Sequence, residues 1–462
     1  MHRKPAYPAI PSAASVSDSN ILDPSRVAHL FPPQLILQWF HQADHDRLWR
    51  DRRLPRPVLF LGALLHALHG RGNFAHALDD AAQLLRPDTL WQSISAGSVN
   101  PARKRLDADV LELGRRHIVS LYDEVGAPSP LPPFRVLCVD GTTFAVADSK
   151  ANAIFGYPGC ARGLAGNPSL RACFVMDAAS HLFIEAVRAG YREASEQELG
   201  DLAIALTAEP GVLFELDRGY YSVIRLRSIV GTGAHALCRV PRQVKLPVLK
   251  RMPDGSYLSF VRHNSASRTL PCGSYDDDLL LRVIEYDILD RGGQRREFRL
   301  VTTVTDWRML PARNAAQGYH LRWREEVGIR ELKWMKKRFA HPCFGGKSPE
   351  IVAQEFEAML LAHASVRLLM AHAAKERGID PTRLSLSGAI AVIGRFLQAA
   401  QAMQGRIAYD LLVSELARQK LYKPNGRVCP RTIKSKRSKF PTRARGSPCS
   451  SYPRLTLKLK RP

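Results

Sequence analysis

Five short apolar runs between residues 134 and 240 limit this chain to a fold built on a β-sheet with helices packed against it. Each run is bounded by turn residues, which is typical of strands, several of them buried on both faces. The runs are FRVLCVDG, LRACFVMD, HLFIEAVRAG, GVLFELDRGYYS and HALCRV. The patterns REASEQELGDLAIAL and SVIRLRSIV, before and after the fourth run, predict helices. The order β-β-β-α-β-α-β therefore predicts the α/β class.

The segments on either side have other patterns. Residues 32–125 are helical by periodicity, GAPSPLPP is a linker by composition, and residues 241–306 hold further strand patterns. The predicted organisation is a flexible N-terminus (1–24), an all-α domain (25–130), an α/β core (131–240 and 307–418), a β-rich insertion (241–306) and a basic tail (419–462). With LRACFVMD and HLFIEAVRAG joined as a hairpin, this order is that of a ribonuclease H-like core with an insertion before a late helix.

Positive charge is concentrated at the end of the chain. The formal net charge is +24, and no Asp or Glu follows Glu415. Arg418 to Arg461 contribute fifteen Lys and Arg, which leaves +9 on the first 415 residues. A basic body with a strongly basic tail suits a polyanion, most simply nucleic acid, although a solvated run has the same composition.

Cysteine usage and hydropathy predict a cytoplasmic protein without a membrane partner. The eight Cys are scattered, with no C-x-x-C pair, which is typical of a reducing compartment and argues against a zinc ribbon. The opening stretch MHRKPAYPAIPSAAS lacks the apolar region of a secretory signal. The longest apolar run, PVLFLGALLHALHG, is too short to span a bilayer.

Three carboxylates stand where α/β proteins commonly place their chemistry. Asp140 and Asp217 each follow an apolar strand, and Glu326 lies on a later helix. Such groups repel one another unless divalent cations balance them, and their oxygens suit two Mg²⁺ or Mn²⁺ ions. Each residue also has an ordinary explanation, because Asp-Gly is a common turn and Glu326 can pair with Arg322 four residues earlier.

The helix predicted over Tyr319–Trp334 carries a polar face around that glutamate. At about 100° per residue, four polar residues fall within a sector of roughly 60°. They are Tyr319, Arg322, Glu326 and Lys333. The apolar residues expected on the opposite, core-facing side are Leu321, Leu332, Met335 and Phe339. The Arg and Lys would hold phosphates on either side of a scissile one, and the Tyr hydroxyl would donate to another phosphate oxygen.

A second basic cluster lies in the N-terminal helical region. The stretch SVNPARKRL places Arg103, Lys104 and Arg105 at the predicted start of a helix, with Asn100 as its cap and Pro101 in its first turn. A helix N-terminus with three cations suits phosphate. A charge cluster of this size is also an ordinary solvated face.

These residues resemble the signature of a known family. The polar helix face matches Y-(2)-R-(3)-E-(6)-K, the signature of the DDE transposases of the insertion-sequence-four family, found in bacterial insertion sequences. VDGTTFAVADSKANAIFGYPG resembles the first-Asp region of that family, and LFELDRGYYS resembles the second. Further family-like stretches are RGLAGNPSLRACFVM, GYREASEQELG, SVNPARKRLDADVLELG and KSPEIVAQEFEAMLLAHASVRLL. The likeness covers roughly residues 30–440.

The resemblance implies a metal-dependent, cut-and-paste transposase. Water would attack at the transposon ends, and a 3′-hydroxyl would then attack the target DNA. The catalytic metal ligands would be Asp140, Asp217 and Glu326. The phosphate-binding residues would be Tyr319, Arg322 and Lys333, with the 103–105 cluster in a helical DNA-binding domain.

The resemblance also implies partners and an intermediate. The partners would be double-stranded DNA, as terminal inverted repeats and target, and a second copy of the chain assembled on that DNA. In relatives the β-rich insertion helps to hold a flipped base and a DNA hairpin, and here Trp307, Tyr257 and Phe260 are alternatives for the stacking aromatic. The expected location is the bacterial cytoplasm, in association with the nucleoid.

Two other functions remain open from the sequence. One is a transposase-derived DNA-binding protein that no longer cuts, which would require a broken ligand set, and none is broken here. The other is a ribonuclease H-like nuclease that does not transpose. Such a nuclease would need neither the Tyr-Arg-Glu-Lys spacing nor a large β-rich insertion.

Overall fold

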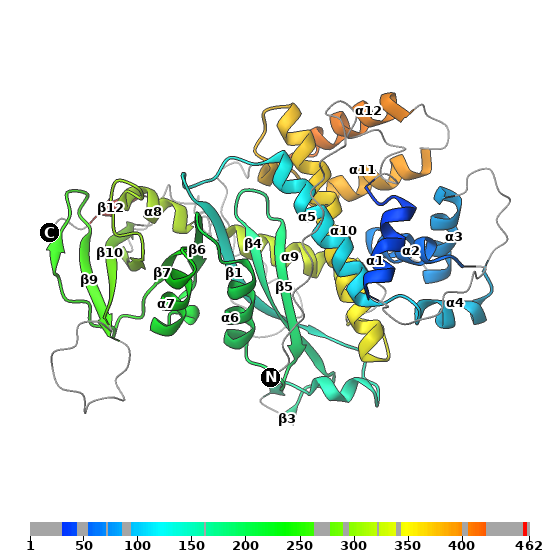
Figure 1. Ribbon diagram of the computed structural model, residues 1–462, viewed down its shortest axis with the longest axis horizontal. Helices are drawn as coiled ribbons and strands as arrows, with labels where there is room; N and C mark the ends of the chain where they lie inside the picture. Colours follow the sequence, from blue (N-terminus) through cyan, green and yellow to red (C-terminus); the bar gives the residue numbers. More distant parts are fainter. Residues whose placement is uncertain are drawn as a thin grey trace, which may run out of the picture.

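The computed structural model describes most of the chain between its two termini. A long sheet runs through the molecule, with helices on both faces and a group of helices at one end (Figure 1). The described residues are 30–43, 54–70, 73–85, 94–160, 163–262, 278–289, 295–320, 323–338, 343–399, 405–421 and 456–459. The predictions for residues 1–24 and for most of the basic tail lie outside them.

The first five long strands of the sheet are those that the apolar runs predicted. Their order in the sheet is β5-β4-β1-β6-β7. The β1–β4 and β4–β5 pairs are antiparallel, and the β1–β6 and β6–β7 pairs are parallel. The strands are β1 (Arg135–Ala145), β4 (Ser169–Asp177), β5 (Phe183–Gly190), β6 (Val212–Leu216) and β7 (His235–Arg239). The predicted α/β class and the predicted hairpin are confirmed.

The strand-rich segment after β7 extends the same sheet. β11 pairs antiparallel with β7, and β10, β9 and β8 follow outward from it. These strands are β8 (Lys250–Arg251), β9 (Tyr257–Arg262), β10 (Asp278–Leu289) and β11 (Arg295–Thr302). Within the predicted tail, β12 (Thr456–Leu459) pairs with β10 (Figure 1). Two further short strands, β2 (Gly159–Cys160) and β3 (Gly163–Leu164), pair with each other.

The helices of the described residues fall into three groups along the chain. Those before the sheet are α1 (Pro33–Ala43), α2 (Arg56–His69), α3 (Phe74–Leu85), α4 (Ala96–Arg103) and α5 (Ala108–Val125). Those between its strands are α6 (Glu196–Thr207) and α7 (Val223–Gly231), the two helices that the sequence predicted there, and each starts at a serine cap. Those after β11 are α8 (Ala312–Tyr319), α9 (Trp323–Arg338), α10 (Pro349–Glu376), α11 (Leu386–Ala399) and α12 (Gly405–Arg418).

The two faces of the sheet are covered by different helices. Leu137 and Val139 of β1 pack with α6 and α7 on one face. Val136 and Cys138 pack with α8 on the other face, and Phe144 packs there with α9 and α10. Because side chains alternate along a strand, even-numbered positions of β1 point toward α8 to α10.

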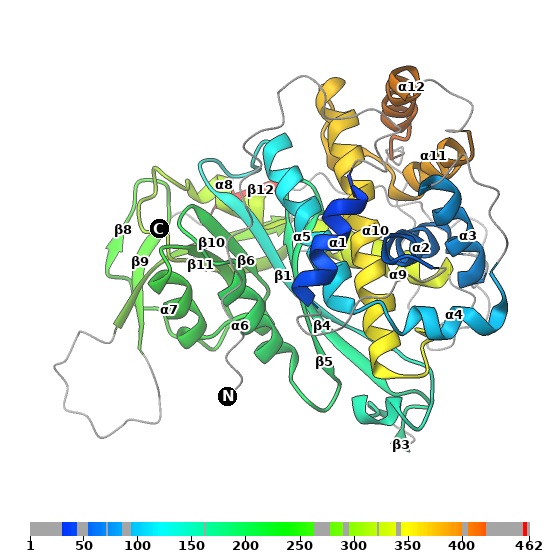
Figure 2. The ribbon, with the colours of Figure 1, turned by 45° about the vertical axis from the view of Figure 1, so that its right-hand side comes forward.

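The helices predicted as an N-terminal domain share a buried core with the last helices. Phe60 of α2, Ile118 of α5 and Met359 of α10 belong to one continuous set of buried apolar side chains. Figures 1 and 2 both show α10 beside α5 and α2. The change of secondary structure near residue 130 is therefore not a change of core.

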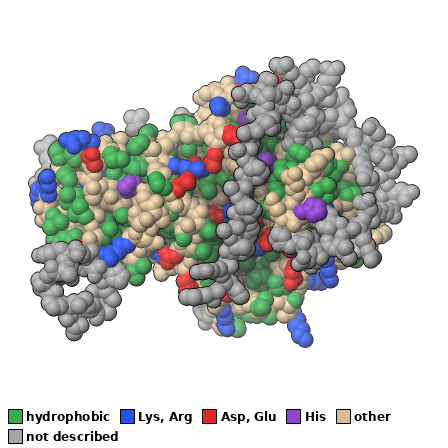
Figure 3. All heavy atoms as spheres, in the orientation of Figure 1, with side chains coloured by type: hydrophobic (Ala, Val, Ile, Leu, Met, Phe, Trp, Pro, Cys, Tyr) green, Lys and Arg blue, Asp and Glu red, His purple; other side chains and the backbone are tan. Residues whose placement is uncertain are grey.

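Hydropathy and surface charge do not separate the described part of the chain into further regions. No helix in the described ranges is both long and apolar enough to cross a bilayer. The cysteines found as free thiols are Cys138, Cys173, Cys238 and Cys343. Acidic and basic side chains are interspersed over the described part of the face in Figure 3, so the charge excess is not one large patch there.

Candidate active site

Asp140 lies within β1 rather than at its end. The apolar pattern predicted a strand that stops before Asp140, but β1 continues to Ala145 because β4 pairs with it along that stretch. The parallel pairing with β6 does stop there, and its last pair is Val139 with Leu216. Asp140 is thus the first residue of β1 beyond its parallel neighbour, and it is half-buried.

Asp217 follows β6 directly and begins the short 3₁₀ turn Arg218–Tyr220. Continuing the β1–β6 register by one residue places Asp217 beside Asp140. The preceding pair, Cys138 and Glu215, has its side chains on one face, with the thiol 3.6 Å from the carboxylate. Because side chains alternate, Asp140 and Asp217 share that face, which is the one that α8 and α9 cover.

The predicted continuous helix from Tyr319 to Trp334 is wrong. α8 ends at Tyr319 and α9 begins at Trp323. Tyr319 is 5% exposed and its hydroxyl oxygen is buried. The buried stripe of α8 is Ala312, Ala315, Ala316 and Tyr319, spaced as one helix face. Burial of this stripe places Tyr319 in the core, so it does not share a helix face with Glu326.

His320 lies at the break between the two helices. Its Nε2 atom is 3.0 Å from the hydroxyl of Tyr286 on β10. Burial and the nearby Arg239 guanidinium lower the pKa of His320, so its ring is neutral at pH 7. Arg322, the second residue of the predicted polar face, lies outside the described residues.

The two faces of α9 otherwise follow the prediction. Glu326 and Lys333 are exposed, whereas Leu332 and Met335 are fully buried. The remaining predicted core positions, Leu321 and Phe339, lie outside the described residues. A helix wheel therefore predicts the faces within α9 but not the point where α9 begins.

A cavity of about 430 Å³ lies between β1 and α9. Asp140 from β1 faces it together with Glu326 and Lys333 from α9, so two predicted carboxylates and one predicted cation meet in one space. The other lining residues are Gly141, Thr142, Ile329, Arg330 and Trp334. Asp217 does not line this cavity. It lies beside Asp140, which does.

The inner side of α9 is held close to the sheet by a glycine and a buried ion pair. A Cβ on Gly328 would meet Met176 Sδ at 2.5 Å, so the glycine lets α9 approach the sheet without displacing that side chain. Glu331 pairs with the buried Arg367 of α10 and lies 3.2 Å from His363 Nε2. These partners outweigh desolvation and lower the pKa of Glu331 to about 2. The exposed Glu326 thus lies on a helix whose opposite side is held in place by buried contacts.

Lys336 is a further contact between α9 and β1 that the sequence did not indicate. It is 7% exposed, and its ammonium donates to the carbonyl of Ala145 over 3.3 Å. The same group lies over the rings of Phe144 and Phe344, at 5.5 and 5.2 Å from the centroids. Burial lowers the pKa of Lys336 to about 8.

The predicted cluster at residues 103–105 lies at the end of a helix, not at its start. α4 begins after a cap at Ser95, so Arg103 is in its last turn and Lys104 is its C-cap. Pro101, predicted in the first turn, lies inside the helix. The predicted helix N-terminus behind these cations is therefore wrong, because the helix starts earlier than the Asn-Pro pair.

Two of these three cations have partners within the protein. Arg103 forms an ion pair with Glu355 of α10 (2.9 Å), and Arg105 donates to the carbonyl of Leu54 (3.1 Å). Lys104 is exposed. The first contact joins α4 to α10, and the two together leave Lys104 as the cation of this cluster best placed for an external partner.

The donors around the cavity fit hard divalent cations by chemistry rather than as a preformed cage. Asp140, Asp217 and Glu326 offer only carboxylate oxygens, the ligands that Mg²⁺ and Mn²⁺ prefer. Within the described ranges, no three His, Cys, Asp or Glu side chains converge closely enough to hold an ion. Sequence reasoning missed Glu215, a fully buried carboxylate two residues before Asp217 on the same face. A glutamate inside the apolar run VLFELD was the available signal.

Comparisons with known proteins identify one matching family model and two similar proteins. The family model described as "Transposase DDE domain" matches residues 131–363. The transposase InsG of insertion sequence element IS4 from Escherichia coli (strain K12) is 26% identical over 419 residues, which cover 89% of this chain and 92% of that protein. A cryo-EM structure of the piggyBac transposase synaptic complex with hairpin DNA superposes with a TM-score of 0.41 and 11% identity, over 86% of each chain.

The family match covers half of the chain. The chain belongs to the transposase DDE domain family. It is a DNA transposase of the insertion-sequence-four kind, an enzyme that cleaves DNA and transfers its strands. Enzymes of this family generally use divalent metal ions.

Proposed function

We propose that Asp140, Asp217 and Glu326 are the catalytic carboxylates of this transposase and together bind two Mg²⁺ or Mn²⁺ ions. The observation that carries the proposal is the cavity shared by Asp140 and Glu326, with the register that sets Asp217 beside Asp140. When bound, such ions lower the pKa of an attacking water or 3′-hydroxyl and stabilise the leaving oxygen. The carboxylates hold them at the edge of the sheet, where a DNA strand has access from solvent.

The proposed catalytic core is ribonuclease H-like. The strand order β5-β4-β1-β6-β7, with an antiparallel β1–β4–β5 meander and parallel β6 and β7, supports this assignment. On this assignment β8 to β11 are an insertion between β7 and α8. The helices α1 to α5 would be a DNA-binding region that shares its buried core with the catalytic part instead of forming a separate domain.

Phosphate binding is assigned to the exposed side of α9. Arg330 and Lys333 line the cavity together with Glu326, and Arg330 lies one helical turn from each of the other two. The two cations would hold phosphates that flank the scissile one. Arg322 remains predicted for the same role. Tyr319 would support the end of α8 from the core, and Lys104 would contact DNA from the helical region.

The proposed substrates are the terminal inverted repeats of the element and a target duplex. Cleavage and joining at two ends require two active sites, so a homodimer assembled on DNA is part of the proposal. The same DNA partner implies association with the nucleoid. Short inverted repeats flanked by a small direct duplication on either side of the gene would support the assignment to transposition rather than to a nuclease.

The decisive test is strand cleavage of a duplex that carries the element's own end, with Mg²⁺ or Mn²⁺. Glu326→Gln is nearly isosteric and exposed, so it should fold and bind DNA normally. Its cleavage rate should fall by roughly 10³-fold, because a lost metal ligand removes several kcal/mol of transition-state stabilisation. Asp217→Asn and Asp140→Asn should lose comparable activity.

The matched control is Glu350→Gln, an exposed carboxylate in the first turn of α10. It should cleave at the wild-type rate. Equal cleavage by Glu326→Gln and the wild type would reduce Glu326 to a surface residue and refute the site. Binding by both without cleavage by either, with either metal, would favour the DNA-binding relic instead.

A further inference from the structure

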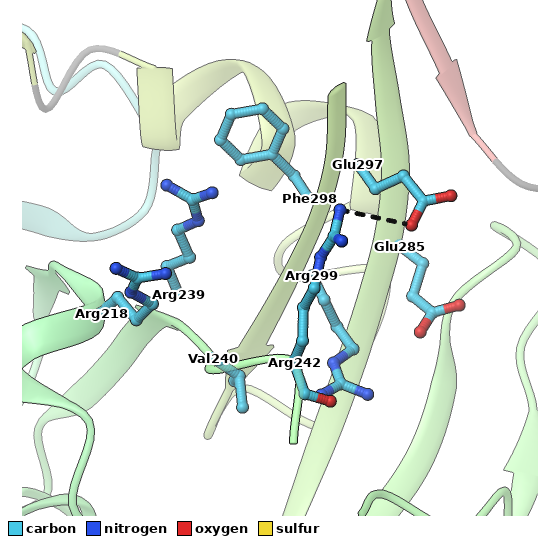
Figure 4. Close-up of a pocket in the computed structure, with 8 residues that line it drawn as sticks. All are labelled: Arg218, Arg239, Val240, Arg242, Glu285, Glu297, Phe298 and Arg299. Carbon is cyan, nitrogen blue, oxygen red and sulfur yellow. Dashed lines mark hydrogen bonds and ion pairs between the residues drawn. The ribbon is translucent and has the colours of Figure 1, made fainter. Parts of the chain in front are cut away.

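A second cavity, of about 320 Å³, has Arg218, the residue that follows Asp217, in its wall. It lies between the ends of β6 and β7 and the neighbouring strands β10 and β11. Its lining residues are Arg218, Arg239, Val240, Arg242, Glu285, Glu297, Phe298 and Arg299 (Figure 4). Four guanidinium groups and two carboxylates thus share one small space.

Two of the four arginines are occupied by the protein itself. Arg299 donates to the backbone carbonyls of Pro241 (2.8 Å) and Val244 (2.8 Å) and so holds the loop after β7. Arg242 lies 3.7 Å from the carboxylate of Glu297. These two cations are therefore not available without loss of an existing contact.

Arg239 is oriented by an aromatic stack instead of a carboxylate. Its guanidinium lies 4.5 Å from the ring centroid of Phe298, and the Phe298 ring also stacks on Tyr286 at 5.4 Å with a 10° interplanar angle. His320 meets the edge of Phe298 at 5.2 Å and bonds the Tyr286 hydroxyl. A cation held flat on a ring keeps its N–H edge free for an oxygen ligand and loses little entropy when it binds one.

Arg218 completes a pair of cations on one side of the cavity. It is exposed and follows Asp217 directly. Figure 4 shows Arg218 and Arg239 on the same side of the cavity, away from Glu285 and Glu297. Across the described part of the chain, no carboxylate pairs with either guanidinium. Two like charges so placed repel each other, and an anion between them would offset that repulsion.

We infer that Arg218 and Arg239 form a binding site for one backbone phosphate of the DNA strand that enters the active site. The inference rests on the proposed function, because it takes Asp217 as a catalytic residue. Planar guanidinium groups match the oxygens of a phosphodiester, and the sequence neighbour Asp217 sets this phosphate close to the scissile one. The site fixes where the strand lies along the sheet and reads no base.

The first measurement is the salt dependence of binding by the full-length protein to the element's end duplex. Arg218→Ala and Arg239→Ala should each lower affinity roughly tenfold and reduce the slope of log K against log salt by about 0.9. Arg242→Ala removes the same charge from the opposite wall and should leave the slope unchanged. Arg239→Lys keeps the charge but not the planar fork, and should recover the slope with only part of the affinity.

The second measurement identifies the phosphate. Single neutral methylphosphonates are placed along both strands of the duplex near the cleavage site. For the wild type, one position should lower affinity about as much as Arg218→Ala does, and at that position the Arg218→Ala variant should show no further loss. Inorganic phosphate at about 10 mM, enough to detect weak charge-assisted binding, is added as a competitor of the duplex. If it lowers DNA binding while no methylphosphonate position does, the two arginines bind a free anion instead.

Three results would overturn the inference. They are an unchanged slope in both arginine variants, an equal change in Arg242→Ala, and a methylphosphonate effect that adds to that of Arg218→Ala. Failure of the proposed function is distinguishable, because it is read from cleavage by Asp217→Asn rather than from binding. A normal salt response of Arg218→Ala beside an inactive Asp217→Asn would remove the phosphate site and keep the catalytic one.

Discussion

α8 and α9 follow each other on the same face of one sheet, yet the contacts that place them differ. α8 lies against β1, β6 and β10 through a stripe of small apolar residues that ends in Tyr319. α9 lies against β1, β4 and β5 through Ile329, Leu332 and Met335, the Lys336 ammonium and the close approach at Gly328, and the ion pair of Glu331 with Arg367 joins it to α10. The signature residues are thereby divided, with Tyr319 in the core and Glu326 and Lys333 at the surface.

This difference shows how one helix can be firm and still present a reactive face. α8 packs through the apolar stripe that ends in Tyr319. α9 combines a narrow apolar side, Ile329, Leu332 and Met335, with charged anchors whose buried partners offset the cost of burying them. α9 therefore keeps a wide exposed face for Glu326, Arg330 and Lys333.

The strongest test of this contrast is Glu331→Gln, which leaves the Arg367 guanidinium buried without its counter-charge. We expect a loss of about 3–5 kcal/mol in the free energy of unfolding, measured by urea denaturation. The control is Glu415→Gln, which removes one partner of the exposed pair with Arg418 (side chains 34% and 72% exposed). The control should change stability by less than about 0.5 kcal/mol. Equal, small effects would mean that charge does not anchor α9.

Acid should loosen α9 before it loosens α8. The folded-state pKa of Glu331 is lowered from 4.5 to about 2, so its stabilising contribution is present above pH 4.5 and is lost as pH falls toward 2. Across that window the wild type should lose about 3 kcal/mol more than Glu331→Gln. Burial also lowers the pKa of His363, which acts in the same direction below pH 6.5. A constant stability difference between the two proteins from pH 6 to pH 3 would contradict the pairing.

Lys333→Ala tests whether the exposed face of α9 meets phosphate. Affinity for the end duplex should fall by about 1.5 kcal/mol, and the salt slope by about 0.9, since one charge-assisted phosphate contact is lost. The free energy of unfolding should change by less than about 0.5 kcal/mol because the side chain is exposed. Lys333→Arg should restore the slope, and a slope that stays at the wild-type value in Lys333→Ala would exclude the contact.

The smallest expected effect is that of Tyr319→Phe. Removal of a buried hydroxyl should change the free energy of unfolding by about 1 kcal/mol, while DNA affinity and the salt slope stay as in the wild type. Parallel measurements with Lys333→Ala make the comparison direct. A loss of affinity without a change in stability would return Tyr319 to the phosphate-binding role that its spacing predicted.

Much of the fold was predictable because it depends on local pattern. The apolar runs predicted the strands β1, β4, β5, β6 and β7, the patterns around the fourth run predicted α6 and α7, and the second and third runs predicted the β4–β5 hairpin. The wheel also predicted the buried side of α9 at Leu332 and Met335. Each of these features is decided within a few residues by periodicity and turn chemistry.

The missed features depend on partners that are distant in the chain. β1 runs past Asp140 because β4 pairs with it, and Arg103 is engaged because α10 brings Glu355 beside it. The same holds for the stack of Arg239 on Phe298, whose residues come from different strands.

The sequence by itself determined the residue types of a carboxylate site, their order along the chain and the α/β class that presents them. Only the tertiary structure decided that the helix breaks at His320, that Tyr319 is buried and that Asp140 and Glu326 face one cavity. The physical reason is that periodicity records which side of a helix is apolar. Where that helix starts, and what its polar side faces, depends on packing energies that one segment does not contain.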